Sequence, residues 1–416
     1  MNYSRLLILL LSLSGSQAYA QQDSETKQNG RDTPSDIEVR ELTADEDPLS
    51  SSEVEQDVES QEAASVDEPR STNFELYGSF RVRYRGQDSD GAWEDGSSRI
   101  GFNMDRKVLD KSNLFARYET GFNLLDSLDS SVSADEFKDS VFKRLGYVGM
   151  ETPRSKIIAG KNWSTYYEIG SFTDRFMGAG GDAAGVFNAQ SDGGSTGTGR
   201  ADEVLQTKMS LDFLSQDMFK PLELNLQIQH GNKIPFGGGE KYGTAIGISS
   251  VMTTRRNLTV GVAYNYAEID LNNDQLLRSI GLTGSSRSFL VGARKFGERW
   301  YAGMVVAKME NHETTDQGMY FDGWGSELYG QYKLTDRVWL IGGYNILEPD
   351  SDQSQTGDYR IRYAMAGLRY SYDEFRRMIF ANVRVNEGLD SDGSLQGDIY
   401  TIGIKWDFAF RGSFGD

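Results

Sequence analysis

The sequence predicts an all-β protein whose main domain is a transmembrane antiparallel β-barrel of about sixteen strands. Three observations lead to this prediction. Many segments after residue 72 place an apolar side chain at every second position, as a strand with one apolar face does. Polar segments rich in Gly, Asp, Ser and Asn separate these strands and alternate between short turns and long loops. The chain also contains no run of 18 apolar residues, so no membrane-spanning helix is expected.

The segment of residues 399–410 (IYTIGIKWDFAF) shows the alternation most clearly. Its aromatic and aliphatic side chains share one face of an extended strand, whereas Gly403, Lys405 and Asp407 share the other. We expect the apolar face to contact lipid and the polar face to line a lumen. The same pattern predicts strands at residues 73–85, 222–229, 258–268, 337–347 and 377–386.

The connections between these segments fall into two kinds. Short turns are expected at 295–299 and 333–337, and long polar loops at 86–98 and 389–398. At roughly 20 residues per strand with its connection, residues 72–416 hold about sixteen strands, an even number as in bacterial barrels. A large soluble sandwich or propeller is the alternative, but no fixed repeat is present and aromatic residues gather near the strand ends. Because lipid offers no hydrogen-bond partners, the sheet must close.

The first twenty residues predict a secretory signal peptide, domain 1–20. A basic Arg5 precedes the apolar run 6–13, and an Ala-x-Ala cleavage site follows at 18–20. The run is too short to span a membrane, and an uncleaved anchor is the alternative. We therefore expect the chain to be exported from the cytoplasm.

Residues 21–71 form an acidic segment of different composition. It holds 16 Asp or Glu against 4 Lys or Arg, a net charge of −12 out of the −19 of the whole chain. It contains no aromatic residue, so it cannot bury enough apolar surface to offset the entropy of ordering. We expect a disordered N-terminal extension, although a weak helical pattern at Val54, Val58 and Ala63 offers pairing with a partner as the alternative.

Composition argues against several kinds of chemistry. The absence of Cys excludes disulfides, thiolate metal sites and Cys nucleophiles, and two histidines, His230 and His312, do not make a His-rich metal site. No Gly-x-Ser-x-Gly elbow precedes His230, which argues against a serine hydrolase. The DSDG segments at 88–91 and 390–393 lack the closing glutamate of a calcium loop, which favours turns over calcium binding. We expect no enzymatic activity, no cofactor and no metal.

Four stretches carry a resemblance to a known family. Residues 74–86 and 98–125 are similar to the opening strands of the Gram-negative general (non-specific) diffusion porins, and residues 142–183 resemble the stretch leading into their third loop. Residues 403–410 resemble the terminal strand that the barrel insertion machinery recognises. The resemblance implies a trimeric sixteen-stranded outer-membrane barrel whose third loop folds inward and narrows the lumen. It also implies an insertion signal at Gly403, Trp406, Phe408 and Phe410.

The resemblance further implies a pore constriction, in which a basic wall faces an acidic loop. Arg99, Lys161 and Arg200 fall at positions similar to members of the basic wall. Asp174 matches an acidic position on the loop.

Two positions depart from the family pattern. The basic residue of the first strand falls at Ser79, although Arg81 is two residues on and on the same face, and the glutamate of the loop falls at Gly178. Alternation, which is independent of the resemblance, turns Arg117 and Glu119 toward the lumen, because a charge on the lipid face costs about 2–4 kcal/mol. A place near a rim, or in a lumen salt bridge, is the alternative for these charges.

The predicted function is that of an outer-membrane porin, which lets small hydrophilic solutes and ions diffuse according to size and charge. The expected partners are these solutes, outer-membrane lipid and lipopolysaccharide, the insertion machinery and two further copies of the chain, with no nucleic acid. The loss of the loop glutamate predicts a pore that is weakly cation-selective or mildly anion-selective. A solute-selective channel, and a structural or adhesive barrel that contacts the envelope through its acidic extension, are the alternatives.

Overall fold

A computed structural model describes most of the predicted barrel. The described residues are 71–87, 90–125, 140–178, 180–214, 217–271, 275–373 and 376–414. The predicted signal peptide and all but the last residue of the acidic extension lie outside these ranges, so both remain predictions.

The described residues form seventeen strands and four short helical segments. The strands are β1 (Thr72–Gln87), β2 (Asp90–Asp95), β3 (Arg99–Leu109), β4 (Ser112–Phe122), β5 (Val141–Thr152), β6 (Ser155–Trp163), β7 (Arg200–Leu211), β8 (Leu222–His230), β9 (Thr244–Thr253), β10 (Leu258–Ala267), β11 (Ser286–Phe296), β12 (Trp300–Thr314), β13 (Tyr320–Lys333), β14 (Val338–Pro349), β15 (Ile361–Asp373), β16 (Arg377–Asn386) and β17 (Ile399–Phe414). The helical segments are α4 (Tyr167–Gly170), η1 (Asn188–Gln190), α5 (Gln275–Ser279) and η2 (Ser354–Thr356). None of these helices is long and apolar enough to cross a membrane.

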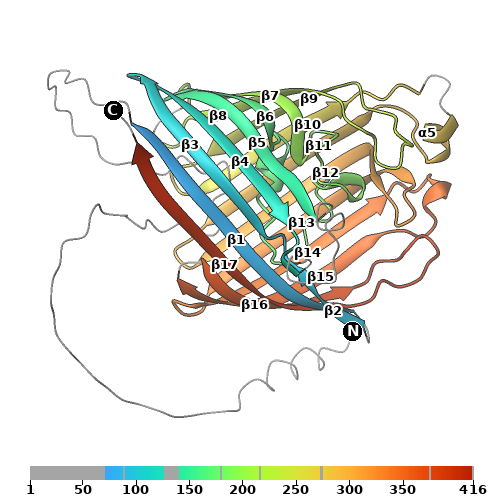
Figure 1. Cartoon of the computed structure of the whole chain (residues 1–416). Coiled ribbons are helices and arrows are strands. Elements are labelled where there is room, and N and C mark those ends of the chain that lie inside the picture. Colours follow the sequence, from blue (N-terminus) through green and yellow to red (C-terminus); the bar gives the residue numbers. More distant parts are fainter. Residues whose placement is uncertain are drawn as a thin grey trace, which may run out of the picture. The chain divides into compact units, whose positions relative to one another are not determined.

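Sixteen of the described strands close into one antiparallel barrel, which confirms the predicted fold class. From β3 to β17, each strand pairs with the next one along the chain. The first strand, β1, then pairs with β3 on one side and with β17 on the other, so the two ends of the barrel sequence lie side by side (Figure 1). Within the described ladder, closure leaves no open edge on these sixteen strands.

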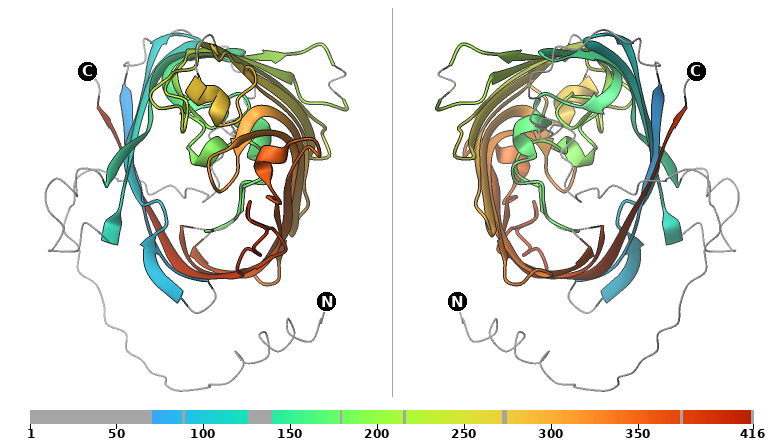
Figure 2. Two further views of the ribbon diagram at one scale, coloured as in Figure 1. Left: turned by 90° about the vertical axis from the view of Figure 1, so that its right-hand side faces the viewer. Right: turned by 90° about the vertical axis from the view of Figure 1, so that its left-hand side faces the viewer.

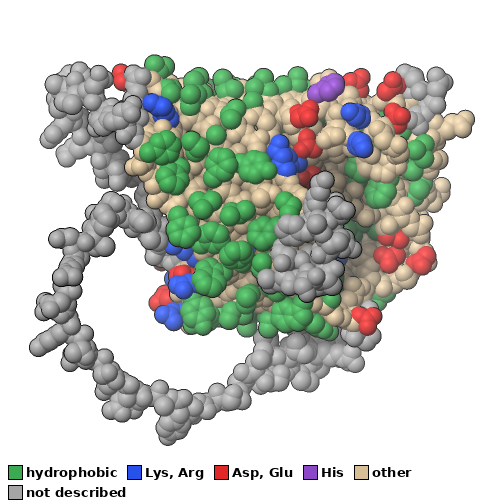
Figure 3. Space-filling model, in the orientation of Figure 1, with side chains coloured by type: hydrophobic (Ala, Val, Ile, Leu, Met, Phe, Trp, Pro, Cys, Tyr) green, Lys and Arg blue, Asp and Glu red, His purple; other side chains and the backbone are tan. Residues whose placement is uncertain are grey.

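The side chains alternate between the two faces of the wall as predicted. On β8, Asn225 and Gln227 are buried on the inner face, whereas Leu226 and Ile228 are exposed on the outer face. On β17, the predicted apolar face is exposed at Trp406 and its neighbours. Figure 3 shows hydrophobic side chains gathered over the outer face of β1, β3 and β4. The outer face is therefore suited to lipid and the inner face to water.

The predicted loop at 86–98 is only partly a loop. Residues 90–95 form β2, which pairs with β1 from Val82 to Gln87 and extends the first hairpin beyond the barrel wall. The chain then returns to the barrel through a tight connection, in which Gly96 donates its N–H to the Arg81 carbonyl at 2.8 Å. Polar composition predicted a loop here, but the pairing with β1 satisfies the backbone as a strand instead. Residues 389–398 do form a loop, with a turn closed by the Gly393 N–H on the Asp390 carbonyl at 2.9 Å.

The apolar core lies inside the barrel rather than between layers. The described residues between β6 and β7, 164–178 and 180–199, lie inside the ring of strands (Figure 2). Tyr166, Ile169 and Phe172 of this segment pack against inner-face residues of β9 to β13 and are almost fully buried. Gly303 and Gly325 make this approach possible, because a Cβ there would stand 2.2 and 1.8 Å from loop carbonyl oxygens.

Replacement of Leu226 by Lys tests the assignment of the outer face. Leu226 lies at the middle of β8 and faces outward, so the charge would sit near mid-membrane. We expect the free energy of unfolding in lipid vesicles to fall by about 2–4 kcal/mol. The matched control is replacement of Phe213 by Lys, since Phe213 is exposed in the connection between β7 and β8. This change should lower the free energy of unfolding by about 1 kcal/mol or less. Equal losses at the two positions would contradict the assignment.

Candidate functional site

The site is built by the segment 164–199, which we call the inner loop. Most of its residues are buried, although the segment has little regular structure beyond α4 and η1. Buried backbone N–H and C=O groups need hydrogen-bond partners, and side chains on the inner face of the barrel supply many of these to the loop. The inner loop is therefore held as firmly as an element of secondary structure.

Glu327 on β13 is the central anchor of the inner loop. Its Oε1 atom accepts the backbone N–H groups of Ala183 and Ala184 at 2.8 and 2.9 Å, and its Oε2 atom accepts the Thr173 hydroxyl at 2.5 Å. The Glu327 side chain is fully buried, so these three bonds replace the water it has lost. They join two points of the loop that are ten residues apart.

Glu168, in the first turn of the inner loop, forms a second anchor. Its carboxylate accepts from the Lys208 ammonium at 2.5 Å, from the Ser249 hydroxyl at 2.7 Å and from the Asn225 amide. These partners come from β7, β9 and β8, so one buried carboxylate ties the loop to three adjacent strands. Sequence reasoning did not single out Glu327, which follows the general pattern of polar lumen positions, or Glu168, which lies in the loop between two strands.

Neutral groups complete the attachment. The His312 Nε2–H donates to the Gly185 carbonyl at 2.8 Å, which leaves Nδ1 to accept the Ser286 hydroxyl at 2.9 Å. Burial raises the pKa of the Tyr166 hydroxyl well above its usual range, so this group stays protonated and donates to the Ala184 carbonyl at 2.9 Å. Both contacts attach the inner loop to the wall or to itself through uncharged groups.

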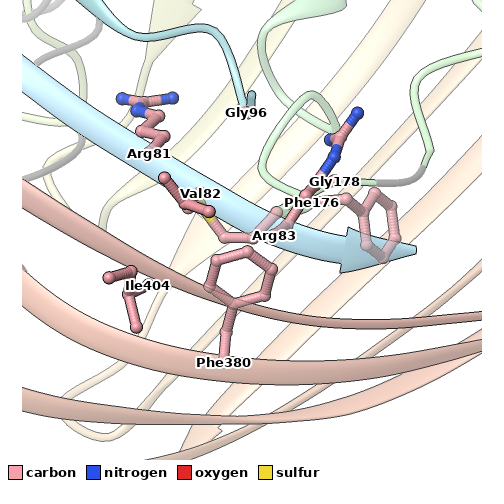
Figure 4. A pocket seen from close by; sticks show the side chains of 9 residues that line it. Arg81, Val82, Arg83, Gly96, Phe176, Gly178, Phe380 and Ile404 are labelled. Atoms are coloured by element: carbon pink, nitrogen blue, oxygen red, sulfur yellow. The ribbon is translucent and has the colours of Figure 1, made fainter. Parts of the chain in front are cut away.

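The tip of the inner loop reaches the strands where the barrel closes. Asn382 on β16 donates to the Met177 carbonyl at 2.5 Å. Gly178 has a φ of +86°, and a Cβ there would stand 3.1 Å from the Arg83 guanidinium. Figure 4 shows Arg83 directed toward Gly178, with Phe176 beside them and Arg81 further along β1. A small cavity of about 50 Å³ remains between the tip and β1, and its wall includes Arg81.

Glu119 on β4 organises the opposite, basic wall. Its Oε1 atom accepts from the Arg144 Nε at 2.6 Å, and its Oε2 atom lies 3.4 Å from the Arg117 guanidinium. The Tyr77 hydroxyl donates to the same Oε2 atom at 3.0 Å and accepts from the Arg117 Nε at 2.9 Å. The predicted lumen-facing pair Arg117 and Glu119 is thus a salt bridge, the alternative that sequence analysis left open.

Arg81 is held by the strand that closes the barrel. Its Nε donates to the Ser79 hydroxyl at 2.7 Å, and that hydroxyl donates to Asp407 on β17 at 2.5 Å. Ser79 therefore orients the arginine that stands two residues beyond it. Asp407 also pairs with Lys405 at 2.7 Å, so its charge is shared.

Arg99 differs from the other cations of the wall. Within the described residues, its guanidinium makes no hydrogen bond or ion pair. It lies within electrostatic range of Arg81 and Arg144 as well as of Glu119. Arg99 is consequently the member of the predicted constriction with the least neutralised charge.

Lys161 and Arg200 form a separate cluster at the start and end of the inner loop. The Lys161 ammonium lies 2.6 Å from Asp202 and 3.0 Å from Asp192, and its side chain is almost fully buried. Arg200 lies 3.6 Å from Asp192 and stands over the Trp163 ring at 5.3 Å. Two carboxylates therefore neutralise the charge of Lys161, so it adds less to the predicted basic wall than an unpaired cation would.

Among the described residues, no hydrogen bond or ion pair joins Asp174 to Lys161 or Arg200. Asp174 accepts the Tyr167 hydroxyl at 2.9 Å, within the inner loop itself. Asp182 reaches further across, because it lies 2.7 Å from Arg384 on β16 and accepts the Tyr363 hydroxyl at 2.9 Å. Sequence analysis did not select Asp182 or Arg384.

Arg144 was also missed, and the reason is a β-bulge. The pairing of β4 with β5 shifts between Glu119 and the next residue, so that Leu145 and Lys143 have partners and Arg144 is the extra residue. Strict alternation would place Arg144 on the outer face with Val148, but the bulge turns its side chain inward. Alternation alone cannot reveal a bulge.

The four residues of the predicted insertion signal lie on β17. Gly403 faces inward, where a Cβ would stand 2.5 Å from the Phe380 ring. Trp406 and Phe410 are exposed on the outer face and Phe408 is half-buried. Their role in insertion remains a prediction.

Comparison with known proteins places these features in context. No family model matches the chain. The chain is 22% identical over 355 residues to the outer membrane porin PhoE of Citrobacter freundii, a match that covers 83% of this chain and 95% of that protein. Its fold is similar to that of Salmonella typhi OmpF, solved in complex with daunomycin, with a TM-score of 0.66, 20% identity and coverage of 80% and 97% of the two chains. The anion-selective porin from Comamonas acidovorans is also similar, with a TM-score of 0.58, 13% identity and coverage of 81% and 100%.

Replacement of Glu327 by Ala tests the anchoring of the inner loop. The change leaves two buried N–H groups and one hydroxyl of the loop without their acceptor, so we expect the free energy of unfolding to fall by about 1–3 kcal/mol or more. We also expect noisier single-channel currents, because the loop is released from β13. Replacement of Glu310 by Ala, which removes a half-exposed partner of Arg287, should cost about 1 kcal/mol or less. Quiet currents together with unchanged stability in the Glu327 variant would refute the anchor.

Proposed function

We propose that this chain, which belongs to the Gram-negative outer-membrane porin family, is a passive diffusion channel for small hydrophilic solutes and ions. The observation that carries the proposal is a closed barrel with a polar inner face, into which one loop is folded and firmly tied. No energy source or chemical step is required. Conductance in a planar lipid bilayer tests the proposal, since a structural or adhesive barrel with a closed lumen would pass no current.

The inner loop accounts for size exclusion. Its anchors lie mainly on β7 to β13, and its tip reaches β16 and the part of β1 near Arg83. The loop therefore leaves most of the side formed by β1, β3, β4 and β5 free. A solute would pass between the loop and this free wall. Because Glu327 and Glu168 fix the loop on several strands, the width of this passage would be set by the folded state rather than by a moving gate.

The free wall gives the passage its charge. Arg81, Arg99, Arg117 and Arg144 line it, whereas Glu119 is its main acid. Charges at this depth act at close range, whereas charges on exposed loops are screened within about 8 Å at physiological salt. We infer a mild preference for anions, even though the chain as a whole carries a net charge of −19.

Replacement of Arg99 by Gln tests the origin of this preference. Arg99 has no ion-pair partner within the described residues, so its removal takes a full charge from the passage. We expect the reversal potential in a salt gradient to shift toward cations, with the permeability ratio changing about two-fold. The matched control is replacement of Arg287 by Gln, since that arginine is exposed and paired with Glu310.

A double variant of Lys161 and Arg200 tests the other basic residues of the predicted constriction. Neutralising Lys161 and Arg200 together should also shift the potential toward cations, because Asp192 and Asp202 would lose their counter-ions. If the Arg99 variant and this double variant both keep the parent potential, the basic groups do not control selectivity and the site assignment fails.

We further propose that three copies assemble in the outer membrane, in contact with lipid and lipopolysaccharide, after insertion by the barrel insertion machinery and export by the signal peptide. Porins are typically trimers, and a closed hydrogen-bonded barrel resists detergent. We expect the extracted protein to run as an oligomer on a gel without heating and as an unfolded monomer after boiling. A monomeric mass in mild detergent, with the same mobility before and after boiling, would contradict the trimer.

A further inference from the structure

A cavity of about 280 Å³ lies on the lumen side of β5 to β8, close to the short turn between β5 and β6. None of the seven predicted constriction residues lines it. Its wall combines charged, amide and aromatic side chains, so it differs from both the lipid face and the arginine-rich free wall. We call it the side cavity.

Most charges around the side cavity are cancelled locally. Three of its residues on the wall are cations, and each is paired with a carboxylate within 3.2 Å. The pairs are Arg154 with Asp212 at 3.1 Å, Lys156 with Glu151 at 3.2 Å and Lys208 with Glu168 at 2.5 Å. Once these pairs are set aside, one carboxylate of the wall remains, that of Glu223.

The Glu223 carboxylate makes no hydrogen bond or ion pair within the described part of the chain. It is half-buried on the inner face of β8, two residues from Asn225 and on the same side. The Glu168 carboxylate lies within its electrostatic range, as do the cations Lys208, Arg294 and Lys220, none of which forms an ion pair with it. A half-buried carboxylate in a cavity gains most from a donor that can enter and contact it directly.

Asn225 supplies a second acceptor in the same cavity. Its side chain is 1% exposed, and its amide nitrogen donates to Glu168 and Ser249. Its Oδ1 atom is buried without a hydrogen-bond partner. A buried acceptor in this state is costly unless a donor from outside the chain completes it.

The aromatic residues of the cavity offer hydrogen-bond donors, whereas Glu223 and Asn225 offer acceptors. The Trp163 ring stacks on Tyr167 with centroids 3.8 Å apart, which holds it in one orientation. No hydrogen bond joins the Trp163 indole N–H or the Tyr147 hydroxyl to another described residue. These groups can therefore donate to an oxygen atom of a solute in the cavity.

We propose that the side cavity is a binding site for a small organic ammonium ion that also carries hydroxyl groups. The ammonium group contacts the Glu223 carboxylate and the Asn225 Oδ1 atom, while Trp163 and Tyr147 bind the hydroxyl oxygens. The site holds such solutes briefly on the short-turn side of the inner loop. This inference rests on the proposed channel function for its role, but binding itself does not require conduction.

Glucamine and sorbitol form a matched pair of probes, because they share one polyol chain and differ by an ammonium group in place of a hydroxyl. In single-channel recordings, we expect glucamine to interrupt the current of the parent protein with a longer residence time than sorbitol. The E223Q variant should shorten the glucamine residence time about ten-fold, the effect of losing one hydrogen bond to a charged group. The E151Q variant should stay within about two-fold of the parent, since Glu151 lies in the same wall but is already paired with Lys156.

Equal residence times for the two probes, or for the parent and the E223Q variant, would overturn the site while leaving the channel function intact. Calorimetric titration of the detergent-extracted protein with glucamine gives a readout that does not depend on conduction. Heat of binding in the parent that is lost in the E223Q variant supports the site even if no current flows. Binding that the E223Q change leaves untouched refutes it.

Discussion

The antiparallel pairing of β1 with β17 is the interaction on which the rest of the molecule depends. It runs over the whole of β1, from Thr72 opposite Phe414 to Gln87 opposite Ile399. Hydrocarbon cannot hydrogen-bond to a free strand edge, so an open sheet of these strands would be unstable in a membrane. Once the ladder is closed, each side chain has only two directions, outward into lipid or inward into the lumen.

Closure creates a lumen, and the inner loop then divides it unequally. The loop is attached through buried carboxylates, Glu168 from its own sequence and Glu327 from the wall, rather than through a sheet. Glycines at 303 and 325 let its backbone approach the wall more closely than any other residue would. Since most of these contacts lie on one side of the barrel, the arginines of the other side are left facing the passage.

The charges of the lumen are arranged locally rather than as two uniform surfaces. Glu119 gathers Arg117 and Arg144, and two aspartates gather Lys161, so much of the basic wall is partly neutralised. Arg99 stands outside these groups, as Glu223 does in the side cavity. Groups of this kind, which have no counter-ion beside them in a confined space, have the largest effect on passing ions, because screening by water is weakest there.

The sequence by itself determined the class of fold, the alternation of the wall and the kind of function. Period-two patterns such as that of residues 399–410 suffice for this, because lipid on one side and water on the other leave few other arrangements for such strands. The resemblance to porins also located the inner loop and the segment around Arg99. Sequence analysis did not reveal the pairing of Lys161 with two aspartates, the anchor at Glu327 or the inward turn of Arg144. These depend on a bulge and on contacts between residues far apart in the chain, which only the closed barrel brings together.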